Sequence, residues 1–272
     1  MKPTVVPGRA LPWWLEEAAP DPPAPSLEGD VEADVAIIGA GYTGLWTALE
    51  LRRCDPTLRV VIVEADRSGL GPSGRNGGFL HGYWANLARL RDRLGDEGAL
   101  ATARAADGVV AAVRALGEDV WLREAGMLNV SAAPAQDRVI DGAVETAREL
   151  GVAEEAIALS DEEVAERCRS PVFRHGVFFR EGGTVQPARL VRALRRAALR
   201  AGAMLFEHSR VRKISPRVIQ TGKGSVRAPE IVVRAVRCRG PWAFGSGRAE
   251  RSGGDAEAFG LESGPCRGQC FA

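Results

Sequence analysis

The first residues of this chain that could do chemistry are three glycines at fixed spacing: Gly39, Gly41 and Gly44. They form "GAGYTG", directly after the apolar run "ADVAII". In such a motif the first glycine permits a tight turn and the second lets backbone approach a pyrophosphate. The third lets the following helix pack closely on the strand, and the N-terminus of that helix offers N–H groups to phosphates. The motif therefore predicts a dinucleotide site.

A carboxylate stands where this motif requires one. Glu64 lies twenty residues after Gly44, at the end of a second apolar run, "LRVVIVEA". A carboxylate there can accept hydrogen bonds from ribose hydroxyls, and it repels a 2′-phosphate. The predicted ligand is an adenosine dinucleotide without that phosphate. Both NAD and FAD satisfy this pattern.

The loop "GPSGRNGGFLHGYW", residues 71–84, follows the acidic strand end and bears on the choice of cofactor. Its serine can donate to a phosphate, and its glycines allow backbone to approach a flat ring closely. Its arginine and asparagine offer donors that would stabilise a reduced, anionic flavin. The alternative is a flexible surface loop. The candidate cofactor-binding residues of the loop are Ser73, Gly74, Arg75, Asn76, Gly77 and Gly78.

Two residues of this loop are candidates for a role in catalysis. Arg75 is predicted to tune the flavin, and His81 to accept a proton or contact the flavin edge. The alternative for His81 is packing beside Tyr83 and Trp84. The other two histidines lie in a turn and at a strand start, and no role is predicted for them.

The elements that position these residues are predicted from hydrophobic periodicity. The two apolar runs and the intervening "YTGLWTALELRRC" form a β-α-β unit of about 30 residues. Further helices are predicted over 98–116, 134–150 and 187–201, and short strands around 204–206, 211–214, 218–220 and 231–233. A capping box is predicted at Ser160 and Glu163.

Each predicted helix has an apolar face. The residues expected to point inward are Val109, Val110, Val113, Leu116, Val139, Ile140, Val144, Ala147, Leu190, Val191, Leu194, Ala197 and Ala198. The last helix also carries five arginines on its outer side, which are interpreted as a plain solvated face. These are Arg189, Arg192, Arg195, Arg196 and Arg200.

Composition narrows the classes of function. The 272 residues are 45% hydrophobic and 26% charged, with a net charge of +1. This charge provides no general field for nucleic acid or an anionic membrane. No apolar run approaches the roughly 20 residues of a membrane span, and the N-terminus lacks the apolar region of a signal peptide. We expect a cytoplasmic protein.

The cysteines predict neither a disulfide framework nor a metal site. There are five of them, an odd number at irregular spacing. Three fall near the C-terminus, at Cys238, Cys266 and Cys270, and their spacing fits no standard zinc pattern.

Three longer segments resemble one known family. They are "WWLEEAAPDPPAPSLEGDVEADVAIIGAGYTGLWTALEL", "VEADRSGLGPSGRNGGFLHGYW" and "GGTVQPARLVRALRRAALRAGA". Together they resemble the FAD-dependent amine and amino-acid oxidoreductases of the D-amino-acid oxidase superfamily, and most closely its γ-glutamylputrescine oxidoreductase branch. The resemblance runs from about residue 13 to 233. "SGRNGG" and "GGTVQPARL" are much more specific than the glycine motif.

The resemblance implies FAD and a small amine or amino-acid substrate. It implies oxidation of the substrate C–N bond to an imine, with dioxygen or another acceptor reoxidising the flavin. The alternatives are a truncated, catalytically inactive FAD-binding remnant and a small NAD-binding protein. The implied cofactor-binding positions are Gly39, Gly41, Gly44, Glu64, Ser73, Gly74, Arg75, Asn76, Gly77 and Gly78, with backbone near Val211 on the adenine side.

The implied fold is α/β (α+β overall), a Rossmann-type FAD-binding domain interleaved with an incomplete mixed-sheet substrate domain. An irregular arm, anchored by Trp13 and Trp14, is expected over 1–30. The FAD-binding domain is expected over 31–95 and 184–235, and a helical substrate-domain part over 96–183. Residues 236–272 are rich in glycine and arginine without periodicity. They are predicted to be either a disordered tail or out of frame. The resemblance to the family stops abruptly after about residue 233, which favours the out-of-frame interpretation over a disordered tail.

Overall fold

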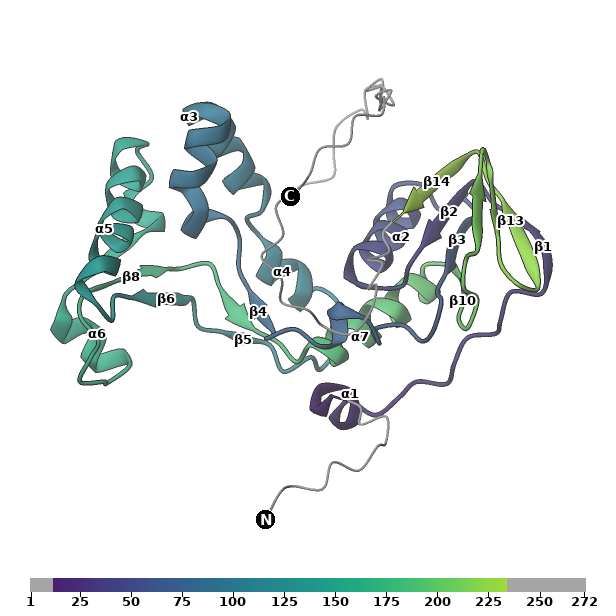
Figure 1. Cartoon of the computed structure of the whole chain (residues 1–272), viewed down its shortest axis with the longest axis horizontal. Coiled ribbons are helices and arrows are strands. Elements are labelled where there is room, and N and C mark those ends of the chain that lie inside the picture. The colour runs from purple at the N-terminus through teal and green to yellow at the C-terminus, as the bar shows by residue number, and fades with distance from the viewer. Residues whose placement is uncertain (1–11, 234–272) are drawn as a thin grey trace, which may run out of the picture. The chain divides into compact units, whose positions relative to one another are not determined.

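The structure is a computed structural model that describes residues 12–233 of the chain (Figure 1). The predictions for residues 1–11 and 234–272, including the tail and its three cysteines, lie outside the described residues. Within the described part, parallel and antiparallel sheets are combined with helices, so the predicted mixed α/β fold class is confirmed.

A four-stranded parallel sheet forms the centre of the first part of the fold. Its order is β10-β3-β2-β14. Every residue of β2 and β3 is buried, as their continuous apolar runs predict. Helix α2 (Tyr42–Cys54) connects these two strands, which confirms the predicted β-α-β unit. The strands are β2 (Val35–Ile38), β3 (Val60–Val63), β10 (Met204–Phe206) and β14 (Glu230–Val233).

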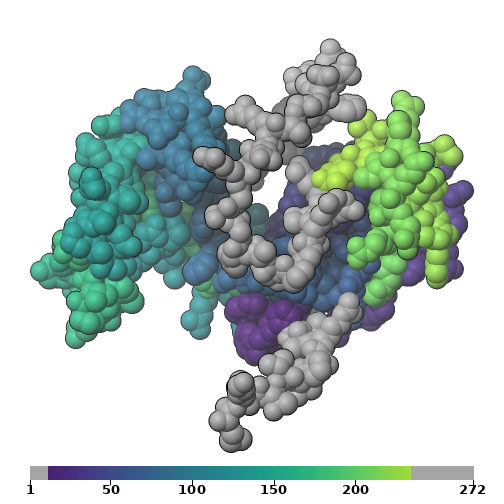
Figure 2. Space-filling model, in the orientation of Figure 1, coloured from purple at the N-terminus to yellow at the C-terminus, as the bar shows by residue number. Residues whose placement is uncertain are grey.

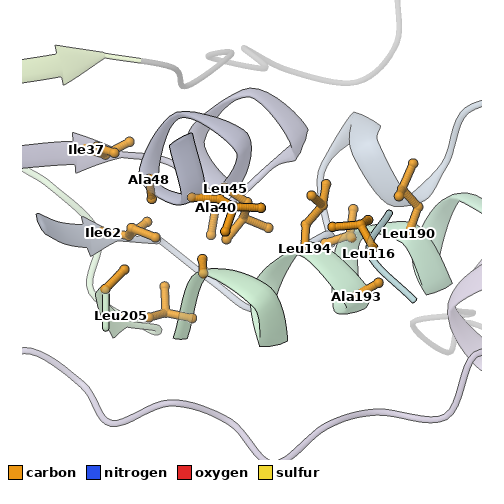
Figure 3. Packing of buried hydrophobic residues seen from close by; sticks show 14 of the residues in the cluster. Ile37, Ala40, Leu45, Ala48, Ile62, Leu116, Leu190, Ala193, Leu194 and Leu205 are labelled. Carbon is orange, nitrogen blue, oxygen red and sulfur yellow. The ribbon is translucent and has the colours of Figure 1, made fainter. Parts of the chain in front are cut away.

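Helices α2 and α7 (Pro187–Arg200) cover one face of this sheet and pack against each other. Alternate strand residues point to opposite faces. Ile37 and Ile62 therefore join Leu45 of α2 and Leu194 of α7 in one buried cluster (Figure 3). This packing fixes the start of α2 relative to the strand ends, where the candidate site lies.

The opposite face of the parallel sheet packs on a second sheet, of order β1-β13-β12-β11. Val61 and Val63 face this side and contact a cluster that includes Ile219 and Val226. The strands are β1 (Gly29–Glu32), β11 (Lys213–Ser215), β12 (Val218–Gln220) and β13 (Gly224–Arg227).

A separate hydrophobic core is built from residues 84–179. Helix α5 (Pro134–Glu149) packs on a three-stranded antiparallel sheet of order β6-β8-β7 and on helix α3 (Leu87–Ala105). The predicted domain boundary at residue 96 stays a prediction, although this core already begins at Trp84. The remaining elements are β6 (Met127–Val130), β7 (Ile157–Leu159), β8 (Gly176–Phe179), α6 (Asp161–Arg167) and the 3-10 turn η3 (Ala153–Glu155).

Two helix predictions in this region are wrong. The predicted helix 98–116 is divided between α3 and α4 (Val109–Arg114), because Gly108 adopts φ +84° between them. Val139 was expected to point inward but is 71% exposed. The capping box at Ser160 and Glu163 is confirmed, with N···O distances of 2.8 and 3.3 Å.

The loop 71–84 is fixed by a small antiparallel sheet of order β4-β9-β5. Strand β4 lies within the loop and pairs with β9, so the "GGTVQ" segment forms the support of the loop. These strands are β4 (Phe79–Leu80), β5 (Arg123–Glu124) and β9 (Gly183–Thr184). The loop also contains the 3-10 turn η1 (Pro72–Gly74), and the 3-10 turn η2 (Trp84–Asn86) begins at its last residue.

Residues 12–28, called the arm below, contain a short helix, α1 (Trp13–Glu17), which the sequence did not predict. The surface of this segment is purple in Figure 2. The two tryptophans were expected to anchor the arm, but Trp13 is 58% exposed. The buried anchor is Leu15, with Trp14 partly buried beside it.

The outer face of α7 is not the plain solvated face that the sequence predicts. Arg195 is only 8% exposed. Arg192 donates to two carbonyl oxygens of the arm, at 2.6 and 3.2 Å. Arg189 forms an ion pair with Glu17 at 2.6 Å. The arginines therefore hold the arm on the helix. Their partners lie far away in sequence, so helical periodicity carries no information about them.

Candidate functional site

The predicted glycine turn connects β2 to α2. Gly39 adopts φ +107°, a conformation that favours glycine. A Cβ atom at Gly44 would lie 2.0 Å from the carbonyl oxygen of Gly39, so α2 contacts the turn too closely for any side chain. A Cβ atom at Gly41 would lie 2.8 Å from the Ser73 hydroxyl. Each glycine thus has a steric reason to be present.

Glu64 lies directly after β3 and reaches back to this turn. Its Oε2 accepts a hydrogen bond from the backbone N–H of Ala40 at 2.8 Å. Its Oε1 accepts one from the N–H of Asp66 at 3.0 Å. The carboxylate is therefore held at the mouth of the turn, with lone pairs left over for further donors.

The loop residues Ser73 and Asn76 are tied to the start of α2. The Ser73 hydroxyl accepts a hydrogen bond from the N–H of Tyr42 at 3.0 Å. The Asn76 amide donates to the Ser73 carbonyl at 2.9 Å, and its oxygen accepts from the N–H of Gly78 at 2.8 Å. The Asn76 side chain therefore stabilises the loop itself. Its amide donors are engaged within the loop and with Tyr42, 3.5 Å away.

Three of the loop glycines differ in their surroundings. A Cβ atom at Gly74 would lie 2.2 Å from a backbone oxygen, as would one at Gly78, which also adopts φ +73°. Gly77 is exposed, and a Cβ atom there would meet only the ring of Phe79, at 3.2 Å. Gly74 and Gly78 are thus required by the packing of the loop, whereas at Gly77 a side chain would make a tight contact with the Phe79 ring but no backbone clash.

The remaining predicted site residues, Arg75, His81 and Val211, make no hydrogen bond to the glycine turn within the described residues. Arg75 and His81 are both exposed on the loop. The His81 Nδ1 lies 2.9 Å from the Gly82 carbonyl oxygen. Val211 lies two residues before β11, outside a strand, and its side chain packs against the core between the two sheets.

Two residues that contribute to this arrangement were missed. Tyr42 occupies a variable position of the glycine motif, yet its hydroxyl donates to the Pro187 carbonyl at 3.0 Å. Burial raises the pKa of Tyr42 to about 12, although a hydrogen bond with Asn76 acts the other way. Gln186, 1% exposed, donates to the Trp14 carbonyl at 2.7 Å. The sequence did contain a signal for both residues, because each is a large polar side chain within a motif: Tyr42 in "GAGYTG" and Gln186 in "GGTVQPARL".

The residues present fit the phosphates of a dinucleotide. Gly41 occupies the N-cap position of helix α2 and has no side chain that could cap it, and the first turn of the helix contains no acidic residue. The partial positive charge of this helix end is therefore not neutralised by the helix itself. Because the Ser73 oxygen accepts from Tyr42, its hydroxyl hydrogen remains available to donate to an anion.

Two acidic residues, Glu181 and Asp107, lie next to each other beside the loop 71–84. Oε1 of Glu181 accepts from the N–H of Val109 at 3.1 Å, while its Oε2 is buried with no partner among the described residues. A Cβ atom at Gly82 would lie 2.6 Å from that Oε2, so the carboxyl group packs on the loop backbone. Burial raises the pKa of Glu181, and repulsion by Asp107 adds to this shift.

We expect Glu181→Gln to stabilise the protein at neutral pH. A raised folded-state pKa means that stability is lost as pH rises from the ordinary value of 4.5 to the folded-state value. Glutamine cannot ionise and can donate toward Asp107. Thermal unfolding at a series of pH values should give a higher Tm for the variant above this window and a smaller difference below it. A Tm difference that does not depend on pH would contradict the assignment.

Asp34 offers a control for this prediction, because its pKa is lowered in the folded protein whereas that of Glu181 is raised. A hydrogen bond from the Arg59 side chain is the main cause that lowers the pKa of Asp34 to about 2. The stability that Asp34 contributes is therefore present above the ordinary value of 3.8 and lost toward pH 2. Asp34→Asn should lower the Tm at neutral pH and have less effect in acid.

Two features were not found in the described part of the chain. None of its helices has the length and apolar character needed to cross a membrane. Residues 12–233 also contain no group of three or more histidine, cysteine, aspartate or glutamate residues arranged to hold a metal ion.

Known proteins are similar to this chain over most of its length. The chain is 32% identical over 229 residues to the probable oxidoreductase OrdL of Rhizobium meliloti, covering 81% of this chain and 53% of OrdL. It is 27% identical over 230 residues to the γ-glutamylputrescine oxidoreductase of Escherichia coli, covering 78% and 50%. The chain therefore spans about half the length of these curated relatives.

Solved structures show the same fold. Glycine oxidase from Geobacillus kaustophilus matches with a TM-score of 0.60 at 24% identity, covering 75% of this chain and 55% of the oxidase. L-Amino acid deaminase from Proteus myxofaciens, in complex with anthranilate, matches with a TM-score of 0.56 at 21% identity, covering 78% and 49%. The family model for DAO, described as FAD dependent oxidoreductase, matches residues 34–272. The chain belongs to this family of FAD-dependent oxidoreductases.

Proposed function

We propose that the chain binds FAD and oxidises the C–N bond of a small amine or amino acid to an imine. The observation that carries this proposal is the contact between the glycine turn and the loop. The Tyr42 N–H bonds to Ser73 beside an uncapped helix end, with Glu64 held at the same turn. Phosphate, flavin and ribose contacts would then come from adjacent segments.

Each part of the site has its own role in holding the cofactor. The N-terminus of α2 and the Ser73 hydroxyl would bind the pyrophosphate, and Glu64 would accept hydrogen bonds from the ribose. Backbone near Val211 would face the adenine. The flavin would lie against the loop, where Gly74, Gly77 and Gly78 have no side chains; the other candidate positions are Gly39, Gly41, Gly44, Arg75 and Asn76.

When bound, FAD would supply the two-electron oxidation of the C–N bond, with dioxygen or another acceptor as the final oxidant. The substrate amine must be neutral at that moment. If Nδ1 of His81 donates to the Gly82 carbonyl, then Nε2 carries the lone pair and can accept the amine proton. Water would hydrolyse the released imine to a carbonyl compound and ammonia.

Arg75 would stabilise negative charge on the reduced flavin, because its guanidinium has no ion-pair partner among the described residues. We expect Arg75→Gln to slow flavin reduction by about tenfold to a hundredfold, less than the loss of a buried oxyanion donor. Arg75→Lys, which retains the charge, should lose less. Stopped-flow reduction rates and the flavin midpoint potential measure both effects. An unchanged potential in Arg75→Gln would contradict this role.

The experiment that tests the reaction is anaerobic addition of small amines and amino acids to the purified flavoprotein. Loss of the oxidised flavin absorption, with release of a carbonyl product on reoxidation, is expected for the proposed enzyme. A protein that retains FAD but is not bleached by any such substrate would support the flavin-binding remnant.

A further inference from the structure

A cavity of about 350 Å³ lies between the arm, the residues that follow β3 and helix α7. Its walls include Leu15 and Pro20 of the arm, Arg67 and Leu70, and Arg192 of α7. None of its lining residues is a candidate for dinucleotide binding. The cavity is therefore a separate feature of the molecule, and nothing in the proposed oxidation uses it.

Three carboxylates line the cavity, those of Glu16, Asp21 and Glu207, and the last two have charged partners. Glu207, 2% exposed, accepts hydrogen bonds from the Ser68 hydroxyl at 2.7 Å and from the N–H of Ala24 at 2.8 Å. Its Oε1 also lies 3.4 Å from the Arg195 Nε. Asp21 forms its closest ion pair with Arg196, at 3.0 Å.

Two guanidinium groups on the cavity wall have no such counter-charge. Arg67 donates to the Asp21 carbonyl oxygen at 2.5 Å, and Arg192 donates to the carbonyl oxygens of Ala19 and Leu15. Neither forms an ion pair within the described residues. Each guanidinium has five N–H donors, so both have donors to spare.

The two arginines also repel each other. Burial lowers the pKa of Arg192, and the positive charge of Arg67 adds to this effect, while Asp21 partly opposes it. Two cations held close together beside a cavity, with neutral carbonyls as their bonded partners, are stabilised when an anion binds both. The apolar wall selects among anions, because a purely inorganic ion would leave Leu15, Leu70 and Pro20 in contact with water.

We propose that this cavity is a binding site for a small organic carboxylate, with Arg67 and Arg192 binding the carboxylate and Leu15, Pro20 and Leu70 contacting the apolar part of the ligand. The site shares no lining residue with the dinucleotide site. It requires no cofactor and no oxidation.

The occupied site would stabilise the arm and the loop together. Leu15 lines the cavity, and its Cδ2 lies 3.0 Å from the position of a Cβ atom at Gly74. A ligand that contacts Leu15 and Arg192 thus joins the arm to α7, next to the segment that holds the candidate flavin loop. We expect ligand binding to raise the Tm as the ligand concentration rises above its Kd.

Calorimetric titration of the full chain with benzoate tests the proposal, with benzamide as the neutral isostere and inorganic phosphate as the purely polar anion. Saturable binding of benzoate is expected, with at least tenfold weaker binding of benzamide and phosphate. Arg192→Gln and Arg67→Gln should each weaken benzoate binding at least tenfold. Arg200→Gln is the matched control, because Arg200 lies on the same helix but bonds Glu118 and does not line the cavity. It should bind benzoate normally.

Arg192 also holds the arm, so its replacement could lose binding by displacing the cavity wall. A second variant therefore tests the cavity without changing an arginine. Leu70→Trp fills the cavity without removing a charge, and it should abolish benzoate binding while circular dichroism stays unchanged. The visible spectrum separates this site from the flavin, because a ligand in the cavity should leave flavin absorption unaltered. Absence of benzoate binding, equal binding by Arg192→Gln, tighter binding of phosphate, or binding that appears only as a flavin spectral change would each overturn the proposal.

Discussion

Gly44→Ala is expected to abolish retention of FAD and to destabilise the fold by about 2–3 kcal/mol, as overpacking at a tight contact does. The added Cβ atom would lie 2.0 Å from the carbonyl oxygen of Gly39 and 3.4 Å from the side chain of Ile37. Helix α2 would have to move away from β2. That movement also displaces the N–H groups at the start of the helix and breaks the contact between Tyr42 and Ser73.

Gly142→Ala is the matched control. Gly142 lies inside α5, and a Cβ atom there meets nothing within 4 Å. Alanine is favoured over glycine in a helix by about 0.5–1 kcal/mol, so this variant should be slightly stabilised and should retain FAD. Flavin absorbance per chain and chemical denaturation measure both properties. Normal flavin content in Gly44→Ala would show that the turn is not as tight as the structure has it.

Glu207→Ala is expected to destabilise the protein by about 3–5 kcal/mol, the range found when one partner of a buried ion pair is removed. Arg195, whose side chain is 10% exposed, would lose its nearest carboxylate. The N–H groups of Ala24 and Ser68 would also lose their acceptor. Denaturant unfolding measures the loss. Glu207→Gln keeps an acceptor oxygen and should lose less.

The effect of Glu207 should depend on pH in a defined direction. Burial acts to raise the pKa of Glu207, but the bonds from Ser68 and Ala24 and the charge of Arg195 outweigh it, so the pKa is lowered. The stability it contributes is present above the ordinary value of 4.5 and is lost as pH falls through the folded-state pKa. Wild type and Glu207→Ala should therefore differ less in strong acid.

Removing the exposed pair between Lys223 and Glu28 provides the comparison for Glu207. These side chains are 66% and 70% exposed, and the N···O distance is 3.1 Å. Lys223→Ala should change stability by less than about 1 kcal/mol. If Glu207→Ala had an equally small effect, the buried Glu207 carboxylate would not stabilise the fold as the structure indicates.

The elements that sequence predicts well are those specified by local residues. Strands β2 and β3 follow from continuous apolar runs, and α7 begins at Pro187 as predicted. Leu190, Val191, Leu194 and Ala198 are buried, and Ala197 is partly buried. Each of these features depends on residues within one turn or one strand.

The features that sequence did not predict depend on distant partners. Four of the five arginines of α7 bond to an arm that lies more than 150 residues earlier, so their spacing indicates only an outer face. The break at Gly108 depends on a positive φ, which a glycine allows but does not require. The turn residues of the candidate site were predicted individually. The bond between Tyr42 and Ser73 that joins turn to loop was not.

Asn76 illustrates the same limit inside the site. Its amide was interpreted as a donor to a reduced flavin, a role that stays a prediction. In the structure its oxygen accepts from Gly78 and its nitrogen donates to the Ser73 carbonyl. A short polar side chain in a glycine-rich loop often bonds to nearby backbone. Arg75, exposed on the same loop, is the residue whose donors remain available.

The most direct test of the central claim is identification of the nucleotide carried by the purified protein. The chain would be denatured, and the released cofactor would be identified by chromatography and mass spectrometry. One FAD per chain, absent from Gly44→Ala and present in Gly142→Ala, is the predicted result. Release of NAD, or equal FAD content in both variants, would contradict the account of the turn and the loop as a flavin dinucleotide site.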